Sequence, residues 1–343
     1  MKAMILAGGL STRLYPLTKS VPKPLVPVAN VPNAVHVMRY LRSHGVSDIA
    51  INVHYHAAMI RQALGDGSAY GVRLEYLEEA ALLGSAGAVK QMESFFDSTF
   101  AVVGCDDLTD IDLERLVAFH REREALATIA LVSAPDVTQY GVVVVDARGR
   151  IVEFQEKPAP GTEKSNLVNT GVYVFEPGIF GRIAAGAFVD FGKDVFPALQ
   201  RENAAFYALE MRDAYWCDIG TPSEYRRATE DVLDRRITLL GDAPGVGDLS
   251  HASLGAGVQI EGSVIAGTGV TIGAGAQLCG PTVLGNNASV GENAIVERAI
   301  LWDGASVGSG ARVTDSILGR GYAVEDGDTV EGEILANEDG TKR

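Results

Sequence analysis

Near its start the chain carries a glycine-rich loop whose residue types are suited to holding phosphate. Residues 6–18 read LAGGLSTRLYPLT, and residues 22–25 read PKPL. Gly8 and Gly9 would let the backbone approach an anion closely, so that exposed N–H groups could donate to its oxygens. Arg13 would add a planar fork of donors. The pattern therefore indicates a site for a phosphorylated ligand.

The loop also has a simpler interpretation, which is a tight turn between a strand and a helix. It lacks the Gly-Lys-Ser/Thr ending of a P-loop and the Gly-x-Gly-x-x-Gly spacing of a dinucleotide site. The glycine pair alone favours the turn. Arg13, Lys19 and Lys23 lie within one short stretch, however, and this group of cations favours phosphate.

Two aspartates far apart in the sequence are candidate metal ligands. Asp106 follows a predicted buried strand at 100–103, so its carboxylate would reach the carboxyl edge of a sheet, while Asp107 would point the other way. Asp218, in the run WCDIGT, precedes a predicted helix. Two such carboxylates could share one Mg²⁺, whose other ligands a nucleotide would supply. A solvated turn remains the simpler interpretation of each aspartate taken singly.

Three further polar motifs lie at the ends of predicted elements. Residues 84–87 read GSAG and open a predicted helix. Small residues there could let a flat ring lie on the backbone, although a helix N-terminus explains them equally well. The motif EKP at 156–158 ends a predicted strand at 151–155. The motif NTG at 169–171 stands just before a predicted strand at 172–175.

The elements that would position these residues alternate between short apolar strands and helices over residues 1 to about 235. We therefore expect an α/β fold with a mostly parallel sheet and helices on both faces, in which ligands bind at the carboxyl ends of strands. The remaining predicted strands are 3–6, 49–53, 128–132 and 142–145, and the predicted helices are 33–44, 57–64, 86–95 and 113–122.

A second architecture begins after about residue 250, where aliphatic residues recur every six positions. Neither period 3.6 nor period 2 is sustained, so the repeat predicts a parallel β-helix with three hexads per triangular coil. A glycine-rich linker is the weaker alternative. Each buried aliphatic would contribute roughly 1.5–3 kcal/mol. The series is Leu254, Ile260, Ala266, Ile272, Leu278, Leu284, Val290, Val296 and Trp302, and after a slip of one residue Val307, Val313, Leu318, Val324 and Val330 continue it.

Composition excludes some classes of partner. With 44 acidic and 29 basic residues among 343, the net charge of −15 argues against nucleic acid and anionic membranes as partners.

We find no secretory signal and no apolar run near the ~20 residues of a membrane span, so we expect a cytoplasmic protein. Cys105, Cys217 and Cys279 lack zinc-type spacing. Strand alternation would point the thiols of Cys105 and Cys217 into the core.

The order LAGGLSTRLYPLT, PKPL, GSAGA, CDD after a strand, EKP, NTGVYVF and WCDIGT runs through most of the chain. This order resembles the sugar-1-phosphate nucleotidyltransferases, or nucleotide-sugar pyrophosphorylases. The hexad repeat is similar to the C-terminal left-handed β-helix of longer members, especially mannose-1-phosphate guanylyltransferases. The resemblance implies a Rossmann-like mixed sheet in a catalytic domain at 1–236, a linker at 237–250, a left-handed β-helix at 251–335 and a polar tail at 336–343.

The resemblance also implies a reaction without a covalent intermediate. A sugar 1-phosphate would attack the α-phosphate of a nucleoside triphosphate in line, pyrophosphate would leave, and positioning and charge stabilisation would supply catalysis. Carried over to matching positions, the site residues fall into four groups. They are Leu6, Ala7, Gly8, Gly9, Arg13, Gly84, Ser85 and Gly87 at the nucleotide; Lys23 at the α-phosphate; Asp106, Gly141, Glu156, Lys157 and Asn169 at the sugar; and Asp106 and Asp218 at Mg²⁺. Within the sugar group, Glu156 and Asn169 would bind the sugar hydroxyls and Lys157 the phosphate of the sugar.

Two positions depart from the family pattern. Ser11 stands where the family usually has glycine, and a positive φ there would cost serine roughly 1–2 kcal/mol. Residues 30–33 read NVPN and lack the family's Lys/Arg-Pro-Met. Ser11 keeps open a second hypothesis, in which the chain is a silent regulatory subunit that binds nucleotide sugar.

Other choices also stay open at this stage. An acyltransferase, which the hexad repeat alone would suggest, lacks a suitable histidine, because His251 precedes the coils. GTP and mannose 1-phosphate are the expected substrates, with thymidylyl or uridylyl transfer to glucose 1-phosphate close behind. Exposed β-helix faces favour self-association, so a homo-oligomer is expected.

Overall fold

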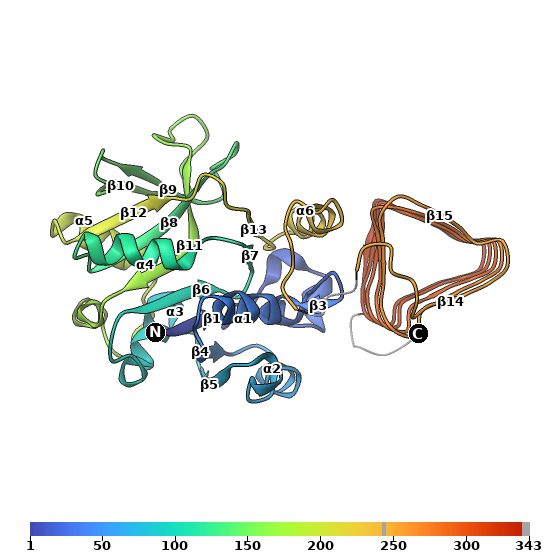
Figure 1. The fold of residues 1–343 in the computed structure, drawn as a ribbon, viewed down its shortest axis with the longest axis horizontal. Helices are drawn as coiled ribbons and strands as arrows, with labels where there is room; N and C mark the ends of the chain where they lie inside the picture. Colours follow the sequence, from blue (N-terminus) through green and yellow to red (C-terminus); the bar gives the residue numbers. More distant parts are fainter. Residues whose placement is uncertain (242–244, 338–343) are drawn as a thin grey trace. The chain divides into compact units, whose positions relative to one another are not determined.

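The computed structural model describes residues 1–241 and 245–337, and the chain divides into two compact units (Figure 1). One unit is formed by Met1–Leu10 and Ala34–Asp218. The other is formed by Ser11–Asn33 together with the chain from Ile219 onward. Among the described residues, no helix has both the length and the apolar composition needed to cross a membrane.

The first unit is built on a mixed sheet of nine strands, which confirms the predicted α/β architecture. The strands are β1 (Lys2–Leu6), β4 (Asp48–Val53), β5 (Arg73–Glu78), β6 (Phe100–Gly104), β8 (Ala127–Ser133), β9 (Gly141–Val145), β10 (Ile151–Glu156), β11 (Leu167–Phe175) and β12 (Phe206–Glu210). Their order is β10-β9-β11-β6-β1-β4-β5, and β8 pairs with β11 and β12. Because β6, β1, β4 and β5 are parallel, their carboxyl ends meet at one edge.

Two sequence predictions are wrong by more than one residue in their bounds. The strand predicted at 172–175 begins at Leu167, so the NTG motif lies within β11, where the register shifts between Asn169 and Tyr173. The helix predicted at 86–95 begins and ends earlier, at Gly84 and Gln91, and Gly84 has a positive φ. The helices of this unit are α1 (Asn33–Ser43, which starts at the boundary), α2 (Ala57–Leu64), α3 (Gly84–Gln91), α4 (Leu113–Glu122) and α5 (Phe196–Arg201).

A cluster of buried phenylalanines forms the core of this unit. Phe100, Phe175, Phe191, Phe196 and Phe206 are each at most 1% exposed. The rings of Phe175 and Phe191 stack with centroids 5.0 Å apart, and those of Phe191 and Phe196 lie 5.5 Å apart. Stacked aromatic pairs add stability beyond their buried area. The cluster therefore holds the segment around Phe191 firmly against β11.

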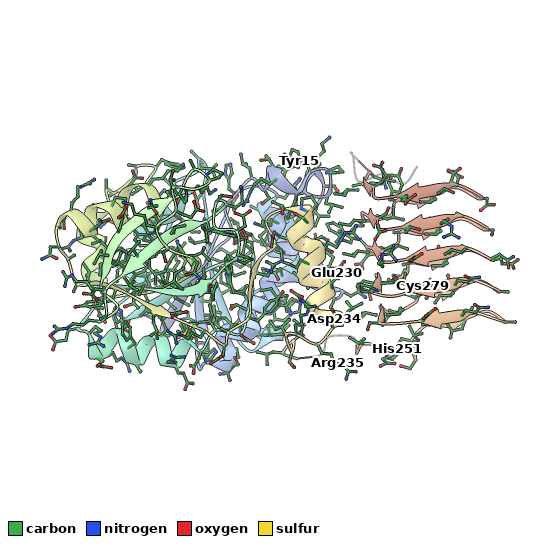
Figure 2. The ribbon with its side chains drawn as sticks, turned by 90° about the horizontal axis from the view of Figure 1, so that it is seen from above. Tyr15, Glu230, Asp234, Arg235, His251 and Cys279 are labelled. Atoms are coloured by element: carbon green, nitrogen blue, oxygen red, sulfur yellow. The ribbon has the colours of Figure 1, made fainter. Side chains whose placement is uncertain are left out.

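The second unit contains the predicted parallel β-helix, a left-handed one, whose triangular section is visible in Figure 1. Figure 2 shows its coils stacked edge on. Each wall is a sheet of five short parallel strands. The first wall consists of β14 (Ser253–Leu254), β17 (Thr271–Ile272), β20 (Ser289–Val290), β23 (Ser306–Val307) and β26 (Ala323–Val324). The second consists of β15 (Gln259–Glu261), β18 (Gln277–Cys279), β21 (Ile295–Glu297), β24 (Arg312–Thr314) and β27 (Thr329–Glu331). The third consists of β16 (Val264–Ala266), β19 (Thr282–Leu284), β22 (Ile300–Leu301), β25 (Ile317–Leu318) and β28 (Ile334–Leu335).

The hexad residues stack in register along the inside of the β-helix. Ile272 pairs with Val290 and Val290 with Val307, so one coil takes 290 − 272 = 18 residues and the next takes 307 − 290 = 17. A slip of one residue is thus confirmed, but it lies before Trp302 and not after it. Leu284 pairs with Leu301, so Leu301 takes the inward position that was predicted for Trp302. Leu254 and Ile260 differ from the inward pattern, because they are 50% and 39% exposed. They belong to the first coil, which has a neighbouring coil on one side only.

Residues 11–33 and helix α6 (Pro222–Leu233) complete the second unit. Short 3-10 turns at Thr12–Leu14, Leu17–Lys19 and Lys23–Leu25 lead into a hairpin of β2 (Pro27–Val28) and β3 (Val31–Pro32). Thr221 caps α6, since its hydroxyl accepts from the backbone N–H of Glu224 at 3.3 Å. The part of the glycine-rich loop after Leu10 thus belongs to the same compact unit as the β-helix.

Ser11 adopts the left-handed conformation, with φ 55° and ψ 36°. The Ser11→Gly variant is expected to raise the free energy of unfolding by about 1 kcal/mol, because glycine carries no Cβ penalty there. The gain stays small because glycine also loses more backbone entropy on folding. Chemical denaturation of the two proteins side by side measures the difference. A less stable variant would mean that the serine side chain makes a contact worth more than the strain.

Candidate active site

A cavity of about 300 Å³ opens at the carboxyl edge of the parallel strands in the first unit. Leu6 ends β1, and Gly8 and Gly9 follow it, so the start of the predicted phosphate loop forms one wall. The remaining lining residues come from three other segments of the chain. They are Asn52, Glu79, Leu82, Gly84, Ser85 and Phe188.

Asn52 and Glu79 form a buried polar pair in this cavity. Asn52 Nδ2 donates to Glu79 Oε1 at 2.5 Å, and the backbone N–H of Ala7 donates to Asn52 Oδ1 at 2.9 Å. The N–H of Leu83 donates to Glu79 Oε2 at 2.7 Å. Both side chains are only 5% exposed. The pair therefore fixes the loop after β1 against the segment before α3.

Neither residue of this pair was predicted from the sequence. Asn52 is a polar residue inside the apolar strand β4, where a hydrogen-bonding partner is needed, and this could have identified it. Glu79 follows β5, a strand that was not predicted because its sequence RLEYLE is neither a continuous apolar run nor a strict alternation. A carboxylate directly after an unrecognised edge strand gives no clear signal on its own.

Close approach explains two of the glycines. A Cβ on Gly8 would lie 2.6 Å from Asn52 Nδ2 and 2.9 Å from Glu79 Oε1. Gly84 has φ +74°, and a Cβ there would lie 2.5 Å from the carbonyl oxygen of Val189. That oxygen accepts the N–H groups of Ala86 and Gly87, each at 3.0 Å. The cavity therefore keeps its shape only with glycine at both positions.

The other two predicted residues of the GSAG motif have structural partners. Ser85 Oγ donates to Asp190 Oδ2 at 2.9 Å and accepts the N–H of Phe191 at 2.9 Å. A Cβ on Gly87 would lie 2.7 Å from the carbonyl oxygen of Ala187. Ser85 lines the cavity, whereas Gly87 packs on the segment behind it.

The candidate metal ligands lie on neighbouring elements. Strand β7 (Asp107–Thr109) pairs with β13 (Trp216–Asp218), and this places Asp218 opposite Asp107. A Cβ on Gly104 would lie 2.7 Å from both Asp106 Oδ1 and Asp107 Oδ2. Asp218 thus lies opposite the residue that follows Asp106 in the sequence. Hard carboxylate oxygens fit Mg²⁺, and the described residues contain no group of three His, Cys, Asp or Glu side chains that could hold a metal alone.

Asp107, the residue after Asp106, accepts hydrogen bonds from two donors. The N–H of Gly104 donates to Asp107 Oδ2 at 3.1 Å, and Trp216 Nε1 donates to Asp107 Oδ1 at 3.0 Å. Its side chain is 4% exposed, so both hydrogen bonds are shielded from water. Cys105 and Cys217 are also buried, as the strand alternation predicted.

Three of the predicted sugar-site residues lie on three neighbouring strands. Gly141 of β9 pairs with Glu156 of β10, and β11 carries Asn169 beside β9. Partial burial raises the pKa of the Glu156 carboxyl, while the charge of Lys157 opposes this shift. Asn169 Nδ2 donates to the hydroxyl of Tyr173 at 3.0 Å. Lys157 follows β10 with φ 47°.

Arg13 and Lys23 belong to the second unit. Arg13 lies in the 3-10 turn Thr12–Leu14 and is exposed, and Lys23 begins the turn Lys23–Leu25 and is 7% exposed. The predicted site residues are thus divided between the two units. The glycines, carboxylates and sugar-site residues lie in the first unit, and the two cations lie in the second.

Comparison with known families agrees with this geometry. A model of the nucleotidyl transferase family matches residues 2–235, and a model of the GMPPB C-terminal domain matches residues 250–341. The chain belongs to the nucleotidyl transferase family. Together with the relatives below, the match identifies this nucleotidyltransferase as an enzyme acting on a sugar 1-phosphate. The resemblance inferred from the sequence motifs is confirmed.

Two curated relatives and one solved structure illustrate the family. A UTP–glucose-1-phosphate uridylyltransferase of Synechocystis is 37% identical over 88% of this chain and 83% of its own. A mannose-1-phosphate guanylyltransferase of Mycobacterium tuberculosis is 32% identical over 79% of this chain and 76% of its own. A Bacillus anthracis protein described as a glucose-1-phosphate thymidylyltransferase has a TM-score of 0.63 and 27% identity, covering 71% of this chain and 98% of that one.

Proposed function

We propose that this nucleotidyltransferase forms GDP-mannose and pyrophosphate from GTP and mannose 1-phosphate. The observation that carries the choice of base is the buried carboxylate of Glu79 in the cavity beside Gly8 and Gly84. Guanine presents adjacent donors at N1–H and N2–H₂, which suit a carboxylate. Uracil and thymine present one N3–H between two carbonyl oxygens, which a carboxylate would repel.

The carboxylate keeps the capacity to accept further hydrogen bonds. Each oxygen of Glu79 has one protein donor, Asn52 Nδ2 at 2.5 Å or the N–H of Leu83 at 2.7 Å. A carboxylate oxygen can accept two. The match of the C-terminal residues to the GMPPB C-terminal domain supports the same choice of substrates.

In the proposed mechanism, the residues of this chain position and neutralise a strongly anionic centre. Asp106 and Asp218 would hold Mg²⁺, which supplies charge stabilisation at the phosphates. Arg13 and Lys23 would act on the triphosphate, and Lys157 on the phosphate of the sugar. Glu156, Asn169 and Gly141 would form the sugar site. We also propose a cytoplasmic homo-oligomer, as the sequence suggested.

A second candidate reaction is uridylyl transfer to glucose 1-phosphate. It is favoured by the relative from Synechocystis, which shares 37% identity over 88% of this chain. Pyrophosphate release with Mg²⁺, measured for every nucleoside triphosphate with mannose, glucose, N-acetylglucosamine and galactose 1-phosphates, separates the two. Turnover with GTP and mannose 1-phosphate is expected. Preference for UTP or dTTP would overturn the base assignment. No pyrophosphate release with any pair, together with thermal stabilisation by a nucleotide sugar, would favour the hypothesis of a regulatory subunit.

The variant Glu79→Gln tests the base assignment at one residue. We expect kcat/KM with GTP to fall by about 10- to 100-fold, because an amide N–H would face the donors of guanine, while activity with UTP relative to GTP should rise. The neighbouring Glu78→Gln is the matched control, since that side chain is 62% exposed. An unchanged ratio of GTP to UTP activity in Glu79→Gln would show that this carboxylate does not read the base.

A further inference from the structure

Lys23 lies in a tightly hydrogen-bonded segment of the second unit. The N–H of Val26 donates to the carbonyl of Lys23 at 3.0 Å, and the N–H of Asn33 donates to the carbonyl of Val26 at 3.0 Å. The second bond closes the hairpin of β2 and β3 directly behind the turn that holds Lys23. Any displacement of this hairpin is therefore transmitted to Lys23.

The tip of the hairpin is fastened to the β-helix. Ala29 and Asn30 form the two-residue turn, with φ 48° and 64°. This pair of positive φ values matches the type I′ turns of tight hairpins. Asn30 Nδ2 donates to the carbonyl of Leu284, at the end of β19, at 2.8 Å. The side chain of the turn residue thus reaches one wall of the β-helix.

The base of the hairpin is held through a chain of two hydrogen bonds. The hydroxyl of Tyr225 on α6 donates to the carbonyl of Pro27 at 2.7 Å, and Trp302 Nε1 of the β-helix donates to that hydroxyl at 2.9 Å. The rings meet edge to face, with centroids 6.2 Å apart and planes at 86°. Tyr225 is 0% and Trp302 is 3% exposed, so bulk water cannot replace either donor.

Helix α6 is itself fixed on the β-helix. Arg226 donates from Nη1 to the carbonyl of Arg298 at 2.9 Å and from Nη2 to the carbonyl of Asp315 at 2.6 Å. These two carbonyls lie on successive coils, because the strands that follow them, β22 and β25, pair with each other. One guanidinium therefore bridges two coils and prevents α6 from sliding along the wall.

From these contacts we propose that the β-helix positions Lys23, with Trp302 acting through the hydroxyl of Tyr225 on the carbonyl of Pro27. The inference rests on the proposed function, in which Lys23 acts on the triphosphate. Trp302 and Tyr225 are positioning residues, since neither touches substrate. The β-helix then controls the position of Lys23, whether or not it also serves assembly.

The test compares full-length variants that remove single donors. Tyr225→Phe loses the hydroxyl, and Trp302→Phe loses the indole N–H while keeping an aromatic ring. Tyr322→Phe is the matched control, because it removes a hydroxyl from the β-helix outside the chain of bonds. Steady-state kinetics in both substrates gives kcat and each KM. Hydrogen exchange at the amides of Val26 and Asn33 reports the hairpin directly.

We expect Tyr225→Phe and Trp302→Phe to lower kcat by about 10- to 100-fold, because a small misplacement of a catalytic group has an effect of this size. The KM for the sugar 1-phosphate should stay unchanged, and amides 26 and 33 should lose protection. The double variant should lose no more activity than Tyr225→Phe alone, since both act through one hydroxyl. Tyr322→Phe should behave as the wild type.

Lower thermal stability with wild-type kcat and wild-type protection of the hairpin would overturn the proposal, since it is what a purely structural contact predicts. Failure of the proposed function is recognised separately, as absent turnover in the unmodified protein. Hydrogen exchange at the amides of Val26 and Asn33 then still tests whether the β-helix anchors the hairpin, and unchanged protection in Trp302→Phe would overturn the proposal.

Discussion

The variant Asp218→Asn is expected to abolish Mg²⁺-dependent turnover while leaving the fold intact. We expect kcat to fall on the order of 10³-fold, which corresponds to a loss of about 4 kcal/mol of charge stabilisation at the phosphates. Asparagine has the same shape as aspartate, so β13 should still pair with β7 opposite Asp107. What the variant lacks is one negative charge at the proposed Mg²⁺ site.

A matched control for this variant lies in the turn before β13. Asp213 is exposed, and Asp213→Asn removes the same charge from the same region of the chain. It should retain wild-type activity and wild-type activation by Mg²⁺. Titration of Mg²⁺ against pyrophosphate release measures both variants. Normal turnover in Asp218→Asn would remove Asp218 from the metal site and leave Asp106 without its proposed partner.

The sequence predicted those parts of the protein that depend on local periodicity. The hexad repeat predicted the β-helix, because each coil repeats the same contacts, but it placed the slip of one residue after Trp302 instead of before Leu301. Helices α2 and α4 have their predicted bounds, since an apolar face at helical spacing determines them. Asp106 and Asp218 were recognised from their places after a predicted strand and before a predicted helix, together with the order of the family's motifs.

The features that sequence reasoning missed depend on contacts between distant segments. Asn52 and Glu79 meet only when β4 and β5 pair, and the sequence of β5, RLEYLE, does not show the strict alternation that would predict a strand. The grouping of Ser11–Asn33 with the β-helix depends on Tyr225 and Trp302, which lie about 200 residues or more beyond that segment. Leu254 and Ile260 are exposed because they lie in the first coil, at the end of the stack, and a repeat pattern does not reveal this effect of the stack's end.

The second large effect is expected for Gly84→Ala, at the point where α3 begins. An added Cβ would lie 2.5 Å from the carbonyl oxygen of Val189 and 2.9 Å from its carbon, and both are backbone atoms that cannot rotate away. Left-handed φ would add roughly 1–2 kcal/mol of strain. We expect the KM for the nucleoside triphosphate to rise by about 100-fold, because the wall of the cavity must move.

Gly45→Ala separates strain from clash in this experiment. Gly45 has φ +75°, nearly the same as Gly84, but a Cβ there meets no atom within 4 Å. Denaturation should show a loss of about 1–2 kcal/mol in Gly45→Ala and a larger loss in Gly84→Ala. Only Gly84→Ala should lose nucleotide affinity, measured by direct binding as well as by KM. Equal behaviour of the two variants would mean that the backbone at Val189 shifts to make room for the methyl group. The cavity beside Gly84 would then be less rigid than the hydrogen bonds from Ala86 and Gly87 to the carbonyl oxygen of Val189 imply.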